Sequence, residues 1–339
     1  MRRTLFVPAL LLTLVFLGSC RKDHVEKIEP FEFNAPDYFP EIQYNFNENQ
    51  VTKGRFKLGK MLFFDPILSS DSTISCASCH AQVHAFADHN VSLSAGVDGR
   101  LGKRNSPSVA NMAFSPAFMW DGGVNHLEIF SLAPITDPNE MDETMSNVIN
   151  KLNQNEIYQW LFKKHYQVDE VNDQVLFRAL TIYVTMIISD QSKFDQWKRG
   201  ETELSPMEEQ GRQLFNSKCA SCHSGALQTD YSYRNNGLDA TFEEDLGRGR
   251  ITQKPEDNGK FKVPSLRNVM LTYPYMHDGR MFTIREVLDH YDEGVVQSET
   301  LDPVLVNGIP MTETEKDQII AFLETLTDYE LLDAQWLNE

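Results

Sequence analysis

Two short segments carry residues whose spacing suits covalent chemistry. The sequence "CASCH" occurs at residues 76–80 and again at residues 219–223. In a C-x-x-C-H motif the two thiols can bond the two vinyl groups of one porphyrin, and the histidine that follows then faces the iron. A pair of zinc sites would need further ligands at normal spacing, which neither segment supplies. The sequence therefore predicts two c-type haems, held by Cys76, Cys79 and His80 and by Cys219, Cys222 and His223.

The N-terminal segment is typical of an export signal. Arg2 and Arg3 precede an apolar run over residues 5–17, which is too short for a membrane-spanning helix. The run ends in "LGSC", similar to the cleavage site of bacterial lipoproteins, so we expect acylation of Cys20; an ordinary cleaved signal peptide is the alternative. The five cysteines are then all assigned, and no disulfide is predicted. We expect an exported protein of the periplasm or cell envelope, attached to a membrane through Cys20.

The chain is acidic, with 49 Asp and Glu against 31 Lys and Arg and a net charge of −18. This balance argues against nucleic acid as a partner. It favours a basic protein partner, attracted by electrostatic steering, although solubility alone would explain the charge equally well.

An internal duplication sets the expected domain organisation. The stretch "PSVANMAFSPAFMWDGG" from Pro107 aligns without a gap with "PSLRNVMLTYPYMHDGR" from Pro264, which pairs Trp120 with His277. Little of the sequence is typical of strands, so we expect an all-α fold of two cytochrome c-like haem domains in tandem. The expected ranges are 1–20 for a lipoprotein signal peptide, 21–45 for a proline-interrupted tether, 46–199 for the first haem domain and 200–339 for the second.

Several helices can be placed from their periodicity and their start signals. Apolar spacing predicts helices within 143–152, 156–166 and 171–188, and the polar stretch 195–205 predicts a linker between domains. Ser205, followed by Pro206 and Glu208, forms the signature of a capping box. Thr312 and Glu315 repeat that signature before the last expected helix.

The motifs around both haem segments resemble the bacterial dihaem cytochrome c peroxidases. The resemblance extends to their relative that matures the tryptophan tryptophylquinone of methylamine dehydrogenase. The matching stretches run from about residue 58 to the C-terminus and include "LGKMLFFDPILS", "GKRNSPSVAN", "MWDGG", "DPNEM", "FKVPSLRNV", "LTYPYMHDGR" and "TIREVLDHY". The resemblance implies that hydrogen peroxide is reduced to water at the first haem. Electrons would enter at the second haem from a small redox protein, either a cytochrome c or a cupredoxin. Family members are often dimers, which implies a homodimer here.

The resemblance also implies roles for particular residues. Glu140 matches the distal glutamate that moves protons, a role that suits a carboxyl group whose pKa burial has raised towards neutrality. Trp120 matches a tryptophan that relays electrons between the haems, and His277 matches a histidine close to the second haem. On the residues alone, a solvated Glu140 and a purely packing role for Trp120 stay open. The implied calcium ligands are Asn105, Thr272 and Pro274.

Departures from the family pattern bear on the first haem. Phe130 stands where the peroxidases have a helpful distal glutamine, and Ser217 stands where the maturation enzyme has the tryptophan that oxidises its substrate. Val97 replaces the histidine that caps the first iron in many peroxidases. His84 and His89 are the other candidate ligands. We expect neither to bind, because His84 leaves on the same side as His80 and His89 lies in a turn-like sequence.

The duplication gives a second prediction about the sixth iron ligands. Fourteen residues past Trp120 is Pro134, which cannot bind iron, and fourteen past His277 is Tyr291, which can. The maturation enzyme also has tyrosine at this position, and Met276 is the rival ligand. We therefore predict a first haem that is open without prior reduction and a second haem bound by Tyr291. Two other functions remain: an oxidase acting on a protein or small organic substrate, and a non-catalytic electron-transfer cytochrome.

Overall fold

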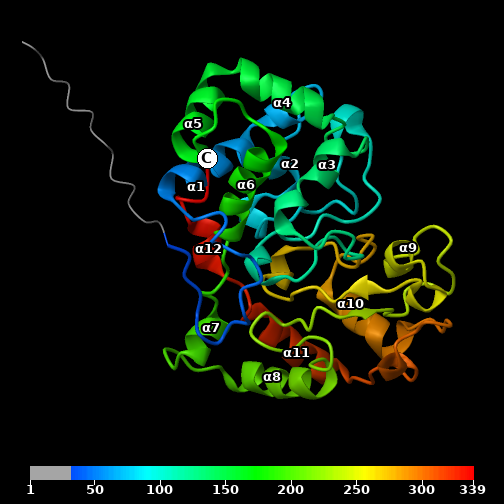
Figure 1. Ribbon diagram of the computed structural model, residues 1–339. Helices are drawn as coiled ribbons and strands as arrows, with labels where there is room; N and C mark the ends of the chain where they lie inside the picture. The colour runs from blue at the N-terminus through cyan, green and yellow to red at the C-terminus, as the bar shows by residue number, and fades with distance from the viewer. Residues whose placement is uncertain (1–31) are drawn as a thin grey trace, which may run out of the picture.

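The computed structural model describes residues 32–339; the predicted signal peptide, Cys20 and the first part of the predicted tether lie outside this range. The chain forms two helical lobes, one above the other in Figure 1. The helices of the upper lobe are α1 (Lys53–Phe64), α2 (Cys76–Cys79), α3 (Leu132–Thr136), α4 (Met145–Gln154), α5 (Glu156–Tyr166) and α6 (Asp173–Thr185).

The lower lobe holds most of the remaining elements. Its helices are α7 (Lys193–Lys198), α8 (Pro206–Lys218), α9 (Arg248–Thr252), α10 (Ile284–Asp289) and α11 (Glu313–Glu324), and α12 (Tyr329–Asp333) follows. Strands β1 (Tyr233–Arg234) and β2 (Phe261–Lys262) form a two-stranded antiparallel sheet in which Tyr233 pairs with Lys262. The predicted all-α class is confirmed, because this sheet is the only one in the described part of the chain.

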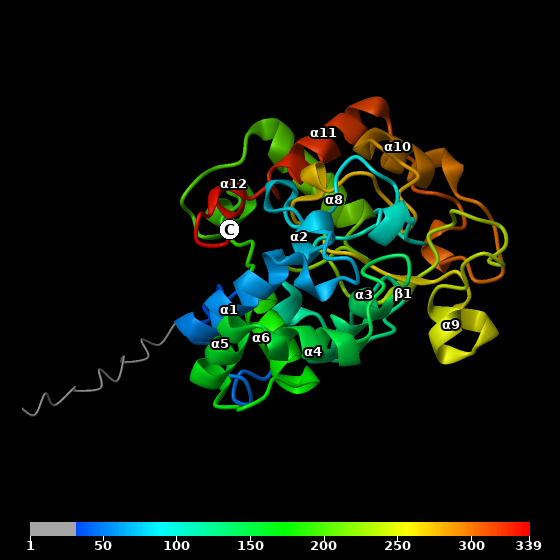
Figure 2. The ribbon, with the colours of Figure 1, turned by 90° about the horizontal axis from the view of Figure 1, so that it is seen from above.

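Each lobe is built around one pair of crossing helices. α1 packs on α6, and α8 packs on α11 (Figures 1 and 2). Equivalent glycines lie where the helices cross: a Cβ on Gly59 would come 2.0 Å from the carbonyl oxygen of Ala179, and one on Gly211 would come 1.8 Å from that of Gln318. No side chain fits between the helices at either point. The duplication seen in the sequence therefore extends to the packing of both lobes.

The predicted helix starts are confirmed. Ser205 accepts a hydrogen bond from the N–H of Glu208, whose carboxylate accepts one from the N–H of Ser205. Thr312 and Glu315 make the same reciprocal pair before α11. Both caps satisfy backbone donors that a helix start would otherwise leave unpaired. The helices they begin then bury Phe215 and Phe322 in one core.

The predicted tether is wrong for its described part. Residues 32–45 pack against the body, with Phe39 and Tyr44 buried. The Phe39 ring makes an edge contact with Phe114 at 5.3 Å between centroids, and the Tyr44 hydroxyl donates to Glu128 at 2.8 Å. Prolines suggested an extended linker, but the aromatic residues between them bury enough apolar surface to fix the segment.

The predicted linker 195–205 is also wrong in its first part, because residues 195–198 belong to α7. Phe194 of that helix packs in the core of the lower lobe. Asp195 is buried and paired with Arg267 at 2.7 Å.

At the C-terminal end of the chain, the tail returns to the upper lobe (Figure 1), where the Tyr183 hydroxyl donates to the carbonyl of Leu337 at 2.8 Å. The two lobes therefore exchange segments.

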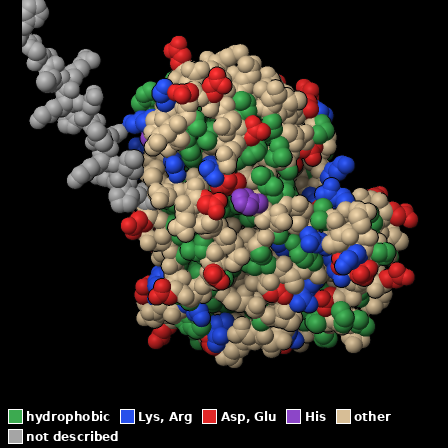
Figure 3. Space-filling view, in the orientation of Figure 1, with side chains coloured by type: hydrophobic (Ala, Val, Ile, Leu, Met, Phe, Trp, Pro, Cys, Tyr) green, Lys and Arg blue, Asp and Glu red, His purple; other side chains and the backbone are tan. Residues whose placement is uncertain are grey.

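Charged residues are spread over the surface. Figure 3 shows acidic side chains scattered over one face and interspersed with Lys and Arg. Among the described residues, no helix combines the length and the apolar character needed to cross a membrane.

Candidate haem sites

A large cavity lies where the two lobes meet, and both C-x-x-C-H segments line it. Its volume is about 1770 Å³. A site for one small ligand measures roughly 300–1,000 Å³, so this cavity has room for more than one. The residues predicted to attach the haems all line it: Cys76, Cys79, His80, Cys219, Cys222 and His223. Among the described residues, the four cysteines form no disulfide.

The two histidines are held in the form that binds iron. The Nδ1 of His80 lies 3.0 Å from the carbonyl oxygen of Phe86, and that of His223 lies 3.1 Å from the carbonyl oxygen of Gln228. A carbonyl can only accept, so each Nδ1 carries the proton and each Nε2 keeps a lone pair for a metal. Burial lowers the pKa of both rings, which favours this neutral form. The residues of this cavity therefore fit two c-type haems.

Local structure positions the two attachment segments differently. Cys76 and Cys79 lie on the short helix α2, which begins with a capping box between Ser75 and Ser78. Cys219 instead follows the last turn of α8, as the residue that caps its C-terminal end. The first segment is therefore held by its own helix and the second by the end of the helix that packs on α11.

The inter-lobe contact repeats the duplication almost symmetrically. The N–H of Asn105 donates to the carbonyl of His277 at 2.8 Å, and the N–H of Lys262 donates to the carbonyl of Trp120 at 2.7 Å. Asn105 and Lys262 each stand two residues before the prolines that align the two halves. The backbone carbonyls of the aligned residues Trp120 and His277 thus each accept a hydrogen bond from the residue that stands two positions before the proline of the other half. This reciprocal contact relates the two halves by an approximate twofold axis.

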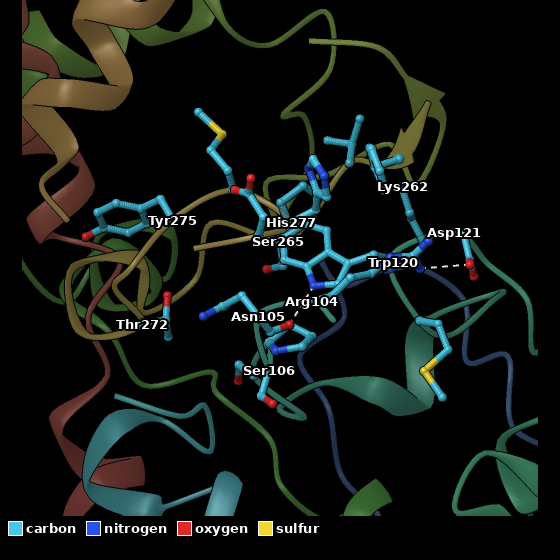
Figure 4. Close-up of a pocket in the computed structure, with 18 of the residues that line it drawn as sticks. Arg104, Asn105, Ser106, Trp120, Asp121, Lys262, Ser265, Thr272, Tyr275 and His277 are labelled. Atoms are coloured by element: carbon cyan, nitrogen blue, oxygen red, sulfur yellow. Dashed lines mark hydrogen bonds and ion pairs between the residues drawn. The ribbon is translucent and has the colours of Figure 1, made fainter. Parts of the chain in front are cut away.

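Trp120 and His277 lie together in the cavity (Figure 4). The indole N–H of Trp120 donates to the carbonyl of Asn105 at 2.8 Å. The His277 ring stacks on Phe261, with 3.8 Å between centroids and 15° between planes. Both rings are therefore fixed in orientation at the point where the lobes touch.

Glu140, Phe130 and Pro134 line the cavity; Phe130 belongs to the same apolar cluster as Cys76, and the charge of Glu140 acts on the Cys76 thiol. Glu140 lines the cavity, where part of the residue is exposed while its carboxyl group is surrounded by protein atoms. Protein atoms around the carboxyl group raise its pKa to about 7, chiefly by burial and secondly through the charge of Asp137. The backbone of Glu140 is also held, because its carbonyl accepts the N–H of Val97 at 2.8 Å.

Neither of the two spare histidines lines the cavity. The rings of His84 and His89 stack on each other at 3.7 Å, and His89 Nε2 lies 3.1 Å from the hydroxyl of Tyr273. Val97, which is buried, is likewise absent from the lining. The only histidines among the described lining residues are His80, His223 and His277.

Both candidate ligands of the second iron line the cavity. Tyr291 lies in a π-helical turn, His290–Gly294, a rare conformation that often marks functional positions. Burial raises the pKa of Tyr291 to about 12. The side-chain amide of Asn236 lies 3.3 Å from the sulfur of Met276. The geometry keeps Tyr291 and Met276 both available, so the choice between them stays a prediction.

The three predicted calcium ligands line the same cavity. Asn105 is buried, and its amide N–H₂ donates to the carbonyl of Ser92 at 3.2 Å, which leaves its Oδ1 for another partner. The described residues hold no group of three His, Cys, Asp or Glu side chains that could bind a metal. A cation at Asn105, Thr272 and Pro274 would therefore be bound by amide and backbone carbonyl oxygens, which are hard ligands suited to calcium.

Sequence reasoning missed a group of charged residues in the cavity. Arg104 binds Asp245 through two hydrogen bonds of 2.7 Å and Asp121 through a third of 2.7 Å. Arg250 binds the same Asp121 at 2.7 Å, and Lys262 lies beside Trp120 (Figure 4). Arg104 and Lys262 both belong to stretches quoted above for the family resemblance, but nothing in their local sequence indicated that they would meet.

The fold and the cavity define a dihaem cytochrome c-type protein. Residues 53–203 match the family described as di-haem cytochrome c peroxidase, and residues 208–327 match the cytochrome c family. The chain is 35% identical over 336 residues to the cytochrome c551 peroxidase of Nitrosomonas europaea, covering 96% of this chain and 92% of that protein. The chain belongs to the di-haem cytochrome c peroxidase family and carries two c-type haems.

Two further similar proteins are named MauG or MauG-like. The chain is 35% identical over 300 residues to the methylamine utilization protein MauG of Methylorubrum extorquens, covering 87% of this chain and 83% of that protein. A crystal structure of a MauG-like protein associated with microbial copper homeostasis superimposes with a TM-score of 0.84 at 29% identity. That match covers 91% of this chain and 99% of that one. The family prediction made from the motifs is confirmed.

Proposed function

We propose that the protein reduces hydrogen peroxide to two waters, using two protons and two electrons from a small cytochrome c or cupredoxin. The observation that carries this proposal is Glu140, a carboxyl group with a pKa near neutrality in a cavity wall beside the first attachment segment. A haem held by Cys76, Cys79 and His80 would supply the electrons and the site of O–O cleavage.

Glu140 handles the protons of this reaction. Its carboxylate takes a proton from one peroxide oxygen and returns it to the other, which leaves as water. A group with a pKa of about 7 can do both at neutral pH, whereas an ordinary glutamate would rarely carry the proton. Phe130 makes the pocket drier than an amide would, and a drier pocket strengthens the effect of the carboxylate on the reacting atoms.

Trp120 carries electrons between the two haems in this proposal. Its indole N–H donates a hydrogen bond to the carbonyl of Asn105, and the N–H of Asn105 donates to the carbonyl of His277 in the other half. Trp120 is therefore linked to both halves of the chain. An indole is readily oxidised, and its fixed orientation avoids reorganisation when an electron passes.

A haem held by His80 would be open in the oxidised protein and would react with peroxide without prior reduction. Val97 and Pro134 replace groups that could close it, and His84 and His89 lie outside the cavity. Tyr291 would bind the iron of a haem held by His223, where a hard anionic ligand would lower the reduction potential. An optical titration of the fully oxidised protein with peroxide tests the open site. Two low-spin irons that respond only after an electron is added would refute it.

The remaining assignments concern ions and location. Calcium binds at Asn105, Thr272 and Pro274, which are supported by their shared place in the cavity wall. The protein is exported to the periplasm or cell envelope, carries a lipid on Cys20 and forms a homodimer. Mass spectrometry of the intact protein checks the lipid, and sedimentation checks the dimer.

Steady-state turnover tests the central proposal. A reduced small cytochrome should be oxidised continuously when peroxide is added. The match to methylamine utilization protein MauG and the tyrosine at position 291 favour one alternative, oxidation of a protein or small organic substrate. That alternative predicts little sustained turnover with a cytochrome. A purely electron-transferring cytochrome would react with neither substrate.

A further inference from the structure

Lys262 is a charged residue in an interior position that the proposed reaction does not use. It belongs to β2 and lines the cavity next to Trp120 (Figure 4). Burial lowers the pKa of its ammonium group to about 8, and no neighbouring charge counters that effect. Among the described residues, its ammonium group makes no hydrogen bond or ion pair and lies 5.7 Å from the ring centroid of Tyr231. A buried charge without an anion is costly, so such groups are normally paired.

The nearby carboxylates are already engaged. Asp121 is fully buried and accepts hydrogen bonds from Arg104 and Arg250. Asp245 is bound by two nitrogens of Arg104. These two arginines and two carboxylates are balanced as a group, so they supply no free negative charge for Lys262.

The haems bring the missing anions. Every c-type haem carries two propionate groups, which lie away from the edge attached to the cysteines. The cysteines are fixed on α2 and at the end of α8, whereas Lys262 lies at the contact between lobes, bonded through its N–H to Trp120. We propose that the Lys262 ammonium pairs with a haem propionate at the inter-lobe edge of the cavity and raises the reduction potential of that haem.

The approximate twofold relation strengthens the assignment. Lys262 occupies the position equivalent to Asn105, and each donates its N–H to the aligned residue of the other half. At Asn105 the side-chain amide oxygen would bind a calcium ion, whereas at the equivalent position the side chain of Lys262 is itself a cation. The two halves would then place positive charge on both sides of the contact by different means.

Removal of the charge should lower a reduction potential. A unit charge in the protein interior changes the energy of a second nearby charge by enough to shift an equilibrium about tenfold. For a one-electron couple that corresponds to about 59 mV. We therefore expect Lys262→Met to lower the potential of one haem by about this amount, and Lys262→Arg, which keeps the charge, to retain the wild-type value.

The experiment is an optical redox titration of the holoprotein, with both haem potentials measured. Lys254→Met is the matched control, because Lys254 is an exposed lysine of the same lobe and its loss should leave both potentials unchanged. If Lys262→Met does not fold with both haems, Lys262→Gln takes its place. Unchanged potentials in a fully loaded variant would overturn the proposal. The inference rests on the two haems and not on peroxide turnover, so a failed peroxidase assay would leave this test intact.

Discussion

Replacement of Glu140 by glutamine should remove both the rate and the pH dependence that this residue provides. The carboxyl group has a pKa of about 7, raised chiefly by burial. It must be deprotonated to accept a proton from peroxide, so activity is present above this pKa and lost as the pH falls through it. Between pH 8 and pH 6 the deprotonated fraction falls from about 0.9 to about 0.1, so kcat/KM for peroxide should fall about tenfold.

The Glu140→Gln variant should be slower by a factor of about 10² to 10⁴ at pH 8 and should show no such decline. Asp137→Asn provides a matched second variant. It removes the charge that helps to raise the pKa of Glu140, so the wild-type profile should move to lower pH. The assay follows oxidation of a reduced small cytochrome at fixed peroxide across this pH range. A glutamine variant within twofold of wild type, with the same profile, would refute the role of Glu140.

Three further predictions address stability and the second haem. Arg267→Met strands the buried Asp195, so unfolding by urea should show a loss of about 3–5 kcal/mol; a loss below about 1 kcal/mol would contradict this. Tyr291→Met should raise the potential of the second haem in a redox titration, and no change would favour Met276 as the native ligand. Gly59→Ala should cost about 1–3 kcal/mol because its Cβ meets a backbone oxygen, whereas Gly102→Ala, with no atom closer than 3.7 Å, should be nearly neutral in the same assay.

Features set by a few neighbouring residues could be predicted. A haem attachment motif works through five consecutive residues, so its chemistry needs no tertiary contact. The capping boxes at Ser205 and Thr312 likewise depend on atoms three residues apart, and both formed as predicted. The duplication was visible because the two halves align residue by residue, and it proved to extend to the crossings at Gly59 and Gly211.

Predictions that depended on distant contacts were less successful. The tether was predicted from the prolines and the polar composition of the segment, but the position of Phe39 is decided by Phe114, which lies far along the chain. The linker prediction failed for a similar reason. Asp195 looks like one more polar residue in a charged stretch until Arg267 is placed against it.

The sequence by itself determined the two haem attachment motifs and the family, and it predicts that Val97 and Pro134 supply no ligand, because these follow from residue identity at aligned positions. Only the tertiary structure decided the surroundings that set chemical behaviour. It put Glu140 where burial raises its pKa to about 7, and it placed Lys262 in the cavity wall with no carboxylate of the described residues paired to it. Desolvation and charge pairing depend on which atoms surround a group in space, and residues far apart in the sequence supply those atoms.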